Sequence, residues 1–217
     1  MESVRKQLCK YGKLVLEKNL AAGPGGNISA RDRDFVYLSP SGFALDEIKE
    51  NQWVKINLKT GKQYGSLRPT CEISMHLGCY LARPDINAVI HTHPPVTLGL
   101  ISAGVELKPF YPDFVAILGR EIPVIDYVIP AGEEIRQAVV EQIKKYNVVL
   151  LKNHGAVCVG TTLKEAFARS WMTEETSKMQ SIGMMVGKIR YFTEEEIKGI
   201  ENLEAEDYRK ALLKKLK

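Results

Sequence analysis

The sequence predicts a single α/β domain in which a mixed, largely antiparallel central sheet is flanked by helices on both faces. Its 217 residues are enough for one sizeable domain with its own core, and no linker, repeat or low-complexity segment divides them. Strand-like and helix-like patterns are interspersed along the chain, which is typical of α/β proteins. Short turns between successive strand patterns favour antiparallel pairing.

Helices are expected where apolar residues recur every three or four positions. The clearest case is residues 133–146, where Ile135, Val139 and Ile143 share one stripe. Thr162 opens another helix, because a threonine followed three residues later by glutamate is typical of a helix start. In chain order, the expected helices cover residues 4–20, 45–49, 72–82, 96–102, 133–146 and 162–186, with a C-terminal helix starting at 193.

Strands are expected in short apolar or alternating segments bounded by turn residues. Residues 53–58 alternate, whereas residues 148–151 form a continuous apolar run typical of a buried strand. The expected strands cover residues 28–30, 35–38, 53–58, 86–93, 122–125, 148–151 and 156–159. We expect one domain over residues 1–217, with a mobile helical tail from about residue 190.

Composition excludes several classes of protein. The formal net charge is only +4, and no block of lysines and arginines of the kind that follows a nucleic-acid backbone occurs, so no nucleic-acid partner is expected. No apolar run approaches the roughly 18 residues of a membrane span, and the first residues do not resemble a signal peptide. Four cysteines without a CxxC pair indicate free thiols in a cytoplasmic protein.

Two histidines two positions apart, His91 and His93, come after the apolar residues 86–90. Side chains two apart on a strand point to the same face, so a strand here presents two imidazoles side by side. Pro94 and Pro95 end the strand and place both rings at its mouth. Adjacent imidazoles suit a tetrahedral metal, although for this motif alone two ordinary polar residues at a strand end are equally consistent.

The chain has only four histidines, and each lies in or beside a candidate site segment. His154 follows a buried strand, and Gly155 would allow a turn with positive φ that brings His154 to the same edge of the sheet. Three histidines with an open fourth position are typical of a catalytic zinc site. Glu72 shares a helix face with His76, and could be a general base or simply a partner of the helix dipole. We expect His76 to hold a ligand or carboxylate in place.

Short loops rich in hydrogen-bond donors form a second group of candidate site residues. Residues 25–27, Ser41 with Gly42, and Thr70 offer backbone N–H groups, hydroxyls and an amide. Thr70 also stands at the start of a helix, where anions are favoured. Each loop alone is an ordinary turn, but together they suit a phosphate.

Five motifs, in their order and spacing, resemble the class II aldolase and adducin family, and within it most the L-fuculose-1-phosphate aldolases. The resemblance covers about residues 5–185 and implies a class II aldolase-like fold. The motifs are Gly25-Gly26-Asn27-Ile28-Ser29, Ser39-Pro40-Ser41-Gly42, Arg68-Pro69-Thr70-Cys71-Glu72, His91-Thr92-His93 and Asn153-His154-Gly155.

The resemblance implies a zinc-dependent aldolase, an aldehyde-lyase with one Zn²⁺ per subunit held by His91, His93 and His154. Glu72 would be the acid/base and could occupy the vacant metal position at rest. The enzyme would reversibly cleave a ketose 1-phosphate of the fuculose type to dihydroxyacetone phosphate and a short aldehyde, through a metal-stabilised enediolate. Such enzymes are usually homotetramers with their sites between subunits.

The resemblance also implies a phosphate site and a proton donor. The family usually has serine in place of Cys71, and a thiol is a poorer donor than a hydroxyl. Family aldolases take a tyrosine from the neighbouring subunit, for which Tyr111 is the candidate, with Asp113 or Tyr208 as alternatives. The phosphate would be held by Gly26, Asn27, Ser41, Gly42, Thr70 and Cys71.

Other reactions of the same family stay open, namely those of sugar-phosphate epimerases, decarboxylases and dehydratases. Epimerases more often carry aspartate at the position of Glu72, which favours aldol cleavage or decarboxylation here. A non-enzymatic interaction module like the adducin head domain is the least favoured alternative, because all three metal-type histidines are present. The sequence does not indicate which aldehyde or sugar phosphate is used.

Overall fold

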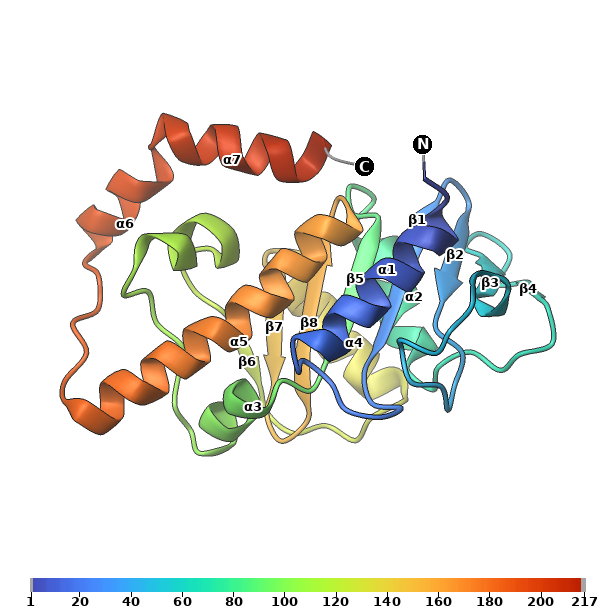
Figure 1. Ribbon diagram of the computed structural model, residues 1–217, viewed down its shortest axis with the longest axis horizontal. Helices are drawn as coiled ribbons and strands as arrows, with labels where there is room; N and C mark the ends of the chain where they lie inside the picture. Colours follow the sequence, from blue (N-terminus) through green and yellow to red (C-terminus); the bar gives the residue numbers. More distant parts are fainter. Residues whose placement is uncertain (1, 216–217) are drawn as a thin grey trace.

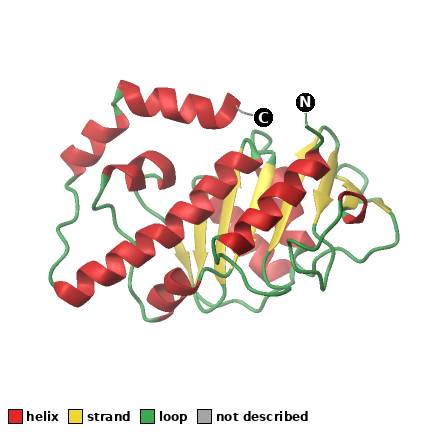
Figure 2. Ribbon diagram, in the orientation of Figure 1, coloured by secondary structure: helices red, strands yellow, loops and turns green. Residues whose placement is uncertain are grey.

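The computed structural model describes residues 2–215 as an eight-stranded sheet with helices on both faces (Figures 1 and 2). The strands lie in the order β4-β3-β2-β1-β5-β8-β7-β6, and every neighbouring pair is antiparallel except β6 with β7. The predicted fold class is therefore confirmed. The strands are β1 (Asn27–Asp32), β2 (Phe35–Leu38), β3 (Val54–Asn57), β4 (Gln63–Tyr64), β5 (Ala88–Thr92), β6 (Val124–Ile125), β7 (Val148–Leu151) and β8 (Gly155–Gly160).

Two layers of helices enclose the sheet. α1 and α5 cover one face, and α2 and α4 cover the other (Figure 1). α3 follows β5 and packs against α5, while α6 and α7 form the C-terminal tail. The helices are α1 (Val4–Glu17), α2 (Ile73–Ala82), α3 (Pro95–Ser102), α4 (Glu133–Ile143), α5 (Leu163–Val186), α6 (Glu194–Glu201) and α7 (Glu204–Lys215).

Strand β5 lies inside the sheet, between β1 and β8, and all five of its residues are buried. Its side chains alternate between the two cores, as the pleat of a strand requires. Val89 packs in the core with α2 and α4, whereas Ala88 and Ile90 pack in the core with α1 and α5. By the same alternation, His91 faces the α2 side and Thr92 faces the α5 side. The alternation directs the chemistry-bearing residues toward α2.

The expected helix over residues 45–49 is not present, and this prediction was wrong. The segment forms a turn, and a short 3-10 turn follows at Glu50–Gln52. Leu45 and Ile48 are both buried, so the segment is shaped by packing rather than by helix propensity. Gly12 of α1 lies so close that a Cβ there would be 2.6 Å from the Leu45 carbonyl oxygen.

The C-terminal region forms two helices where one was expected. Ile197 and Ile200 of α6 pack against Val115, which belongs to an unpredicted π-helical turn at Phe114–Leu118. Arg209 of α7 lies 2.9 Å from the Asp113 carboxylate. These contacts hold the tail against the body of the chain, and its mobility stays a prediction. Residues 1, 216 and 217 of the predicted domain lie outside the described part of the chain.

Candidate metal centre and active site

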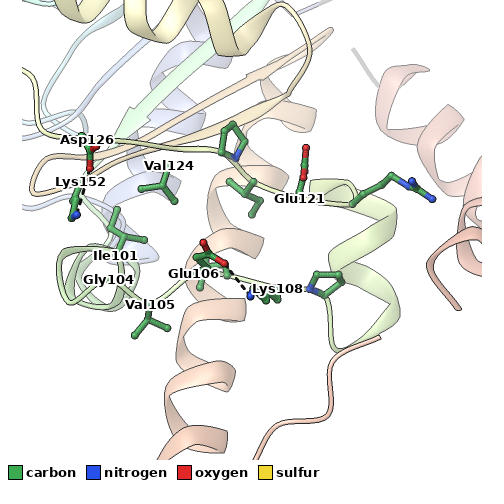
Figure 3. Close-up of a pocket in the computed structure, with 14 residues that line it drawn as sticks. Ile101, Gly104, Val105, Glu106, Lys108, Glu121, Val124, Asp126 and Lys152 are labelled. Carbon is green, nitrogen blue, oxygen red and sulfur yellow. Dashed lines mark hydrogen bonds and ion pairs between the residues drawn. The ribbon is translucent and has the colours of Figure 1, made fainter. Parts of the chain in front are cut away.

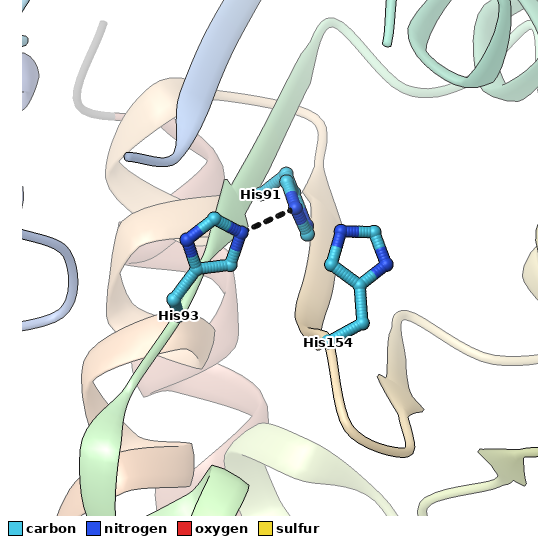
Figure 4. A group of neighbouring side chains, drawn as sticks. All are labelled: His91, His93 and His154. Carbon is cyan, nitrogen blue, oxygen red and sulfur yellow. Dashed lines mark hydrogen bonds between the residues drawn. The ribbon is translucent and has the colours of Figure 1, made fainter. Parts of the chain in front are cut away.

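Three histidine side chains converge at one end of β5 (Figure 4). His91 is fully buried, and its Nδ1 donates a hydrogen bond of 3.0 Å to the Ala156 carbonyl oxygen in β8. That bond leaves the lone pair of Nε2 free to bind a cation. His93 follows the end of the strand, and its Nε2 lies 3.0 Å from Nε2 of His91. The two imidazoles lie side by side, as their spacing predicted.

His154 comes to the cluster from the turn between β7 and β8, with its ring centroid 4.8 Å from that of His91. The residue with positive φ in this turn is Asn153, at 56°, and not Gly155 as expected. Gly155 is needed for space, because a Cβ there would lie 2.2 Å from the Thr92 carbonyl oxygen. The missing side chain lets the start of β8 approach the end of β5.

Glu72 stands directly before α2, makes no side-chain cap to that helix and reaches the histidines instead. Its Oε2 lies 3.1 Å from His91 Nε2 and accepts a 2.9 Å hydrogen bond from Asn27 Nδ2. Its Oε1 lies 3.3 Å from His154 Nε2 but has no hydrogen bond of good geometry with any described residue. Burial raises the pKa of this carboxyl, but the interactions with His91, His154 and Asn27 outweigh burial and lower the pKa well below its usual range.

Three separations among these four side chains are close to those of a tetrahedral divalent metal site. Bonds of about 2.0–2.1 Å from Zn²⁺ to nitrogen or oxygen place neighbouring tetrahedral ligand atoms about 3.3 Å apart. The separations of 3.0, 3.1 and 3.3 Å among Nε2 atoms and Glu72 oxygens are close to that value. One ligand atom from each of His91, His93 and His154 lies within 4.8 Å of the others. A cation would also satisfy the unpaired Glu72 oxygen.

His76 does not join the histidine cluster, and it reaches the Glu72 carboxylate only through Asn27 rather than holding a carboxylate or a metal ligand directly as expected. Its Nε2 lies 2.5 Å from Asn27 Oδ1, and its Nδ1 lies 2.7 Å from Ser29 Oγ. Ser29 Oγ in turn lies 2.8 Å from the Tyr80 hydroxyl. Burial lowers the pKa of His76 to about 3, so its ring is neutral. Ser29 and Tyr80 are not among the predicted site residues, although Ser29 is two residues after Asn27 on a strand and Tyr80 is four after His76 on a helix.

Two of the loops predicted to hold a phosphate lie side by side. Backbone hydrogen bonds of 2.9 and 3.0 Å join residues 39–41 to residues 68–70. Gly42 has a φ of 83°, a conformation that favours glycine. Ser41, Gly42 and Cys71 are exposed to solvent. The paired loops therefore present accessible donors beside the start of α2.

Thr70, Gly26 and Asn27 of the predicted phosphate site are more enclosed. The Thr70 hydroxyl accepts a hydrogen bond of 3.3 Å from the Glu72 N–H. Gly26 has a φ of 72°, and a Cβ there would lie 3.0 Å from the His91 carbonyl oxygen. The Asn27 amide is bonded through both its oxygen and its nitrogen. Asn27 thus supports Glu72 and retains only one amide N–H for a substrate.

The candidate proton donors lie away from the histidine cluster in this chain. The Tyr111 hydroxyl lies 2.7 Å from Thr176 Oγ1 in α5, and Asp113 pairs with an arginine of α7. Tyr208 is exposed on α7, which lies at the opposite end of the sheet from the turn that carries His154 (Figure 1). The assignment of a proton donor from a neighbouring subunit therefore stays a prediction.

A separate hollow of about 440 Å³ lies between the end of α3 and β6 (Figure 3). Its charged side chains are paired with one another or with neighbours, as in Lys108 with Glu106 at 3.0 Å and Lys152 with Asp126 at 3.4 Å. No strained or unpaired catalytic group marks it within residues 2–215. The chemistry of the described chain is concentrated around Glu72.

None of the helices in residues 2–215 is both long and apolar enough to cross a membrane.

Comparisons with known proteins point to one family. The family model for the class II aldolase and adducin N-terminal domain matches residues 6–181. An L-fuculose phosphate aldolase of Methanocaldococcus jannaschii is 30% identical over 184 residues, which cover 85% of this chain and 99% of the relative. A 3-oxo-tetronate 4-phosphate decarboxylase of Pectobacterium atrosepticum is 29% identical over 202 residues, covering 90% of this chain and 91% of the relative. The structure of an L-fuculose 1-phosphate aldolase has a TM-score of 0.85 at 29% identity, covering 96% of this chain and 98% of that one.

Proposed function

The chain belongs to the class II aldolase and adducin family and is an enzyme of the aldolase type. We propose that it is a zinc-dependent aldolase acting on a ketose 1-phosphate. The products are dihydroxyacetone phosphate and a short aldehyde, and the reaction is reversible. The observation that carries the proposal is the placement of Glu72, whose two oxygens lie 3.1 and 3.3 Å from Nε2 atoms of His91 and His154.

His91, His93 and His154 would hold one Zn²⁺ per subunit. When bound, the ion would act as a Lewis acid that polarises the substrate carbonyl and stabilises the negative charge formed as the carbon–carbon bond breaks. The Ala156 carbonyl supports this role, because it takes the Nδ1 proton of His91 and keeps Nε2 available. His91 lies in β5, His93 directly follows β5, and His154 lies in the turn between β7 and β8.

Glu72 would move the proton in this reaction. Its ionised carboxylate can accept a proton from the substrate carbon next to the carbonyl in the direction of condensation, and return that proton in the direction of cleavage. Burial keeps water from competing for this carboxylate, and the hydrogen bond from Asn27 holds it in place. A carboxylate beside a bound divalent ion is well placed for such a transfer.

The paired loops would hold the substrate phosphate. Ser41, Gly42 and Cys71 are exposed, whereas Gly26, Asn27 and Thr70 are more enclosed. Backbone N–H groups and hydroxyls in such loops bind anions without a dedicated positive charge.

The proposal also includes a homotetramer in which Tyr111 of a neighbouring subunit serves as proton donor. The four free cysteines are compatible with the expected cytoplasmic location.

A same-family decarboxylase is the second candidate, favoured by the 29% identity to the 3-oxo-tetronate 4-phosphate decarboxylase. The relatives described above name neither an epimerase nor a dehydratase. A non-enzymatic adducin-like module is disfavoured by the complete set of His91, His93, His154 and Glu72.

The experiment is to measure metal content and turnover on the same preparation. We expect one zinc per chain, and release of dihydroxyacetone phosphate from at least one of L-fuculose, L-rhamnulose, ribulose and 5-deoxypentulose 1-phosphates. The matched variant is His91→Ala, which should lose both the zinc and the turnover. Zinc without cleavage, but with release of carbon dioxide from 3-oxo-tetronate 4-phosphates, would replace the aldolase by the decarboxylase. Absence of bound zinc after reconstitution would overturn the metal site itself.

A further inference from the structure

A line of buried hydrogen bonds runs from α2 through β1 to Glu72. Its members in order are Tyr80, Ser29, His76, Asn27 and Glu72. The four donor–acceptor distances along it are 2.8, 2.7, 2.5 and 2.9 Å. All five side chains are buried, so water does not compete for these groups. A buried chain of this kind specifies where each proton lies.

Only one arrangement of protons satisfies the whole line. The ionised Glu72 carboxylate can only accept, so the Asn27 nitrogen must face Glu72 and the Asn27 oxygen must face His76. The amide oxygen also only accepts, so His76 must carry its proton on Nε2. The neutral ring then accepts at Nδ1 from the Ser29 hydroxyl, whose oxygen accepts from the Tyr80 hydroxyl. Every bond in the line therefore donates toward Glu72.

The orientation of the Asn27 amide decides what it can do in the site. If the amide turned over, its oxygen would face a carboxylate oxygen at about 2.9 Å, where both atoms only accept. In the orientation required, one N–H binds Glu72 and the second N–H is left for a substrate oxygen. Nothing in Asn27 itself selects this orientation, whereas the Glu72 carboxylate selects it from one side and the Nε2 proton of His76 from the other.

We propose that His76 is a positioning residue that, with Ser29 and Tyr80, fixes the Asn27 amide so that it holds the Glu72 carboxylate and presents its second N–H to the substrate. His76 touches neither the substrate nor the metal ligands, and it acts only through Asn27. The kinetic consequences rest on the proposed function. The proton positions are a property of the folded protein and do not depend on its activity.

The first experiment measures the tautomer of His76 by ¹⁵N NMR of the full-length protein, with the signal assigned by its loss in His76→Gln. We expect a neutral ring protonated at Nε2 and unprotonated at Nδ1. A ring protonated at Nδ1 would overturn the proposal, whatever the enzyme turns over. Failure of every substrate in the aldolase panel would leave this readout unchanged, so the two proposals fail separately.

The second experiment is a double-mutant cycle between His76→Leu and Asn27→Ala, using kcat and KM on the best substrate. We expect His76→Leu alone to lower kcat/KM about 10- to 100-fold, as removal of such supporting partners does at metal sites. Because His76 acts through Asn27, the double variant should lose little more than Asn27→Ala alone. Fully additive losses would show that His76 is merely structural and would overturn the proposal.

Two further variants separate positioning from folding. His76→Gln keeps a donor for Asn27 and an acceptor for Ser29, so it should recover most of the activity lost in His76→Leu. Tyr80→Phe removes only the hydroxyl at the start of the line, and should reduce kcat/KM in the same direction but less. Equal losses in His76→Gln and His76→Leu at equal thermal stability would contradict the inferred role.

Discussion

Two glutamates lie buried on opposite sides of the segment that carries His91 and His93, and they differ in one respect. Glu174, on α5, is fully buried and accepts three hydrogen bonds, of 3.1 Å from the Val96 N–H and 2.9 Å from both the N–H and the hydroxyl of Thr97. Glu72 is nearly as buried, but one of its oxygens lacks a good hydrogen bond and faces imidazoles. The two side chains are almost equally buried, but all the oxygens of Glu174 accept hydrogen bonds and one oxygen of Glu72 does not.

The satisfied glutamate has a structural explanation. Pro94 occupies the cap position of α3 and carries no side-chain acceptor, and Pro95 has no N–H. The next N–H groups, of Val96 and Thr97, would be left without partners, and Glu174 serves as their cap from another helix. A buried carboxylate with every oxygen hydrogen-bonded therefore anchors a helix, whereas one with an unbonded oxygen beside histidines is ready for chemistry.

Replacing each glutamate by glutamine should affect turnover very differently. Glu72→Gln keeps the size of the side chain but removes the base, and should lower turnover by about 10³-fold with the fold intact. Glu174→Gln is the comparison variant: its amide turns one N–H toward the donors at the start of α3 and should reduce stability, but it should retain far more turnover than Glu72→Gln. Dihydroxyacetone phosphate release, measured together with circular dichroism, checks both. If the two glutamine variants lost activity equally, the distinction between the glutamates would be wrong.

Glu174 should also matter for the stability of the fold. Glu174→Ala leaves two N–H groups and a hydroxyl buried without acceptors, and should lower the free energy of unfolding by about 3 kcal/mol. Glu175→Ala is the control on the same helix. Glu175 makes an exposed ion pair with Lys178 and accepts an exposed hydrogen bond from the Trp171 indole, and its loss should cost less than about 1 kcal/mol. Urea unfolding measures both variants. A Glu174→Ala protein as stable as the control would contradict the capping role.

The smallest expected effect tests the exposed rim of the same site. Cys71→Ser replaces a weak thiol donor by a hydroxyl beside the proposed phosphate position. One improved hydrogen bond should lower KM about two- to fivefold with little change in kcat. Steady-state kinetics on the best ketose 1-phosphate provides the measurement. An unchanged or higher KM would mean that this side chain does not face the substrate anion.

The central part of the site could be predicted from sequence because short-range rules determine it. The spacing of His91 and His93 predicts that their two imidazoles lie together at the end of β5, and the apolar run before His154 predicts β7, which β8 separates from β5. Both strands form, and the three rings converge. The helix expected over residues 72–82 also forms, at Ile73–Ala82.

The remainder depends on contacts between segments far apart in sequence. The segment from Leu45 to Ile48 is shaped by its approach to Gly12, which no local pattern shows. The partnership of Ser29 with His76 spans 47 residues, and that of Val96 with Glu174 spans 78. Buried polar partners of this kind have no periodic signature, so a sequence alone identifies the residues and not the pairing.

The position of β5 between β1 and β8 has a consequence for how the protein folds. His91 is hydrogen-bonded to a residue 65 positions away, and the strand on its other side precedes it by a comparable distance. Contacts between segments so far apart form slowly, because a long loop must close before they contribute stability. We therefore expect the histidine cluster to assemble late in refolding, only after the chain through β8 is in place. Shorter fragments of the chain should have no affinity of this kind for a metal ion.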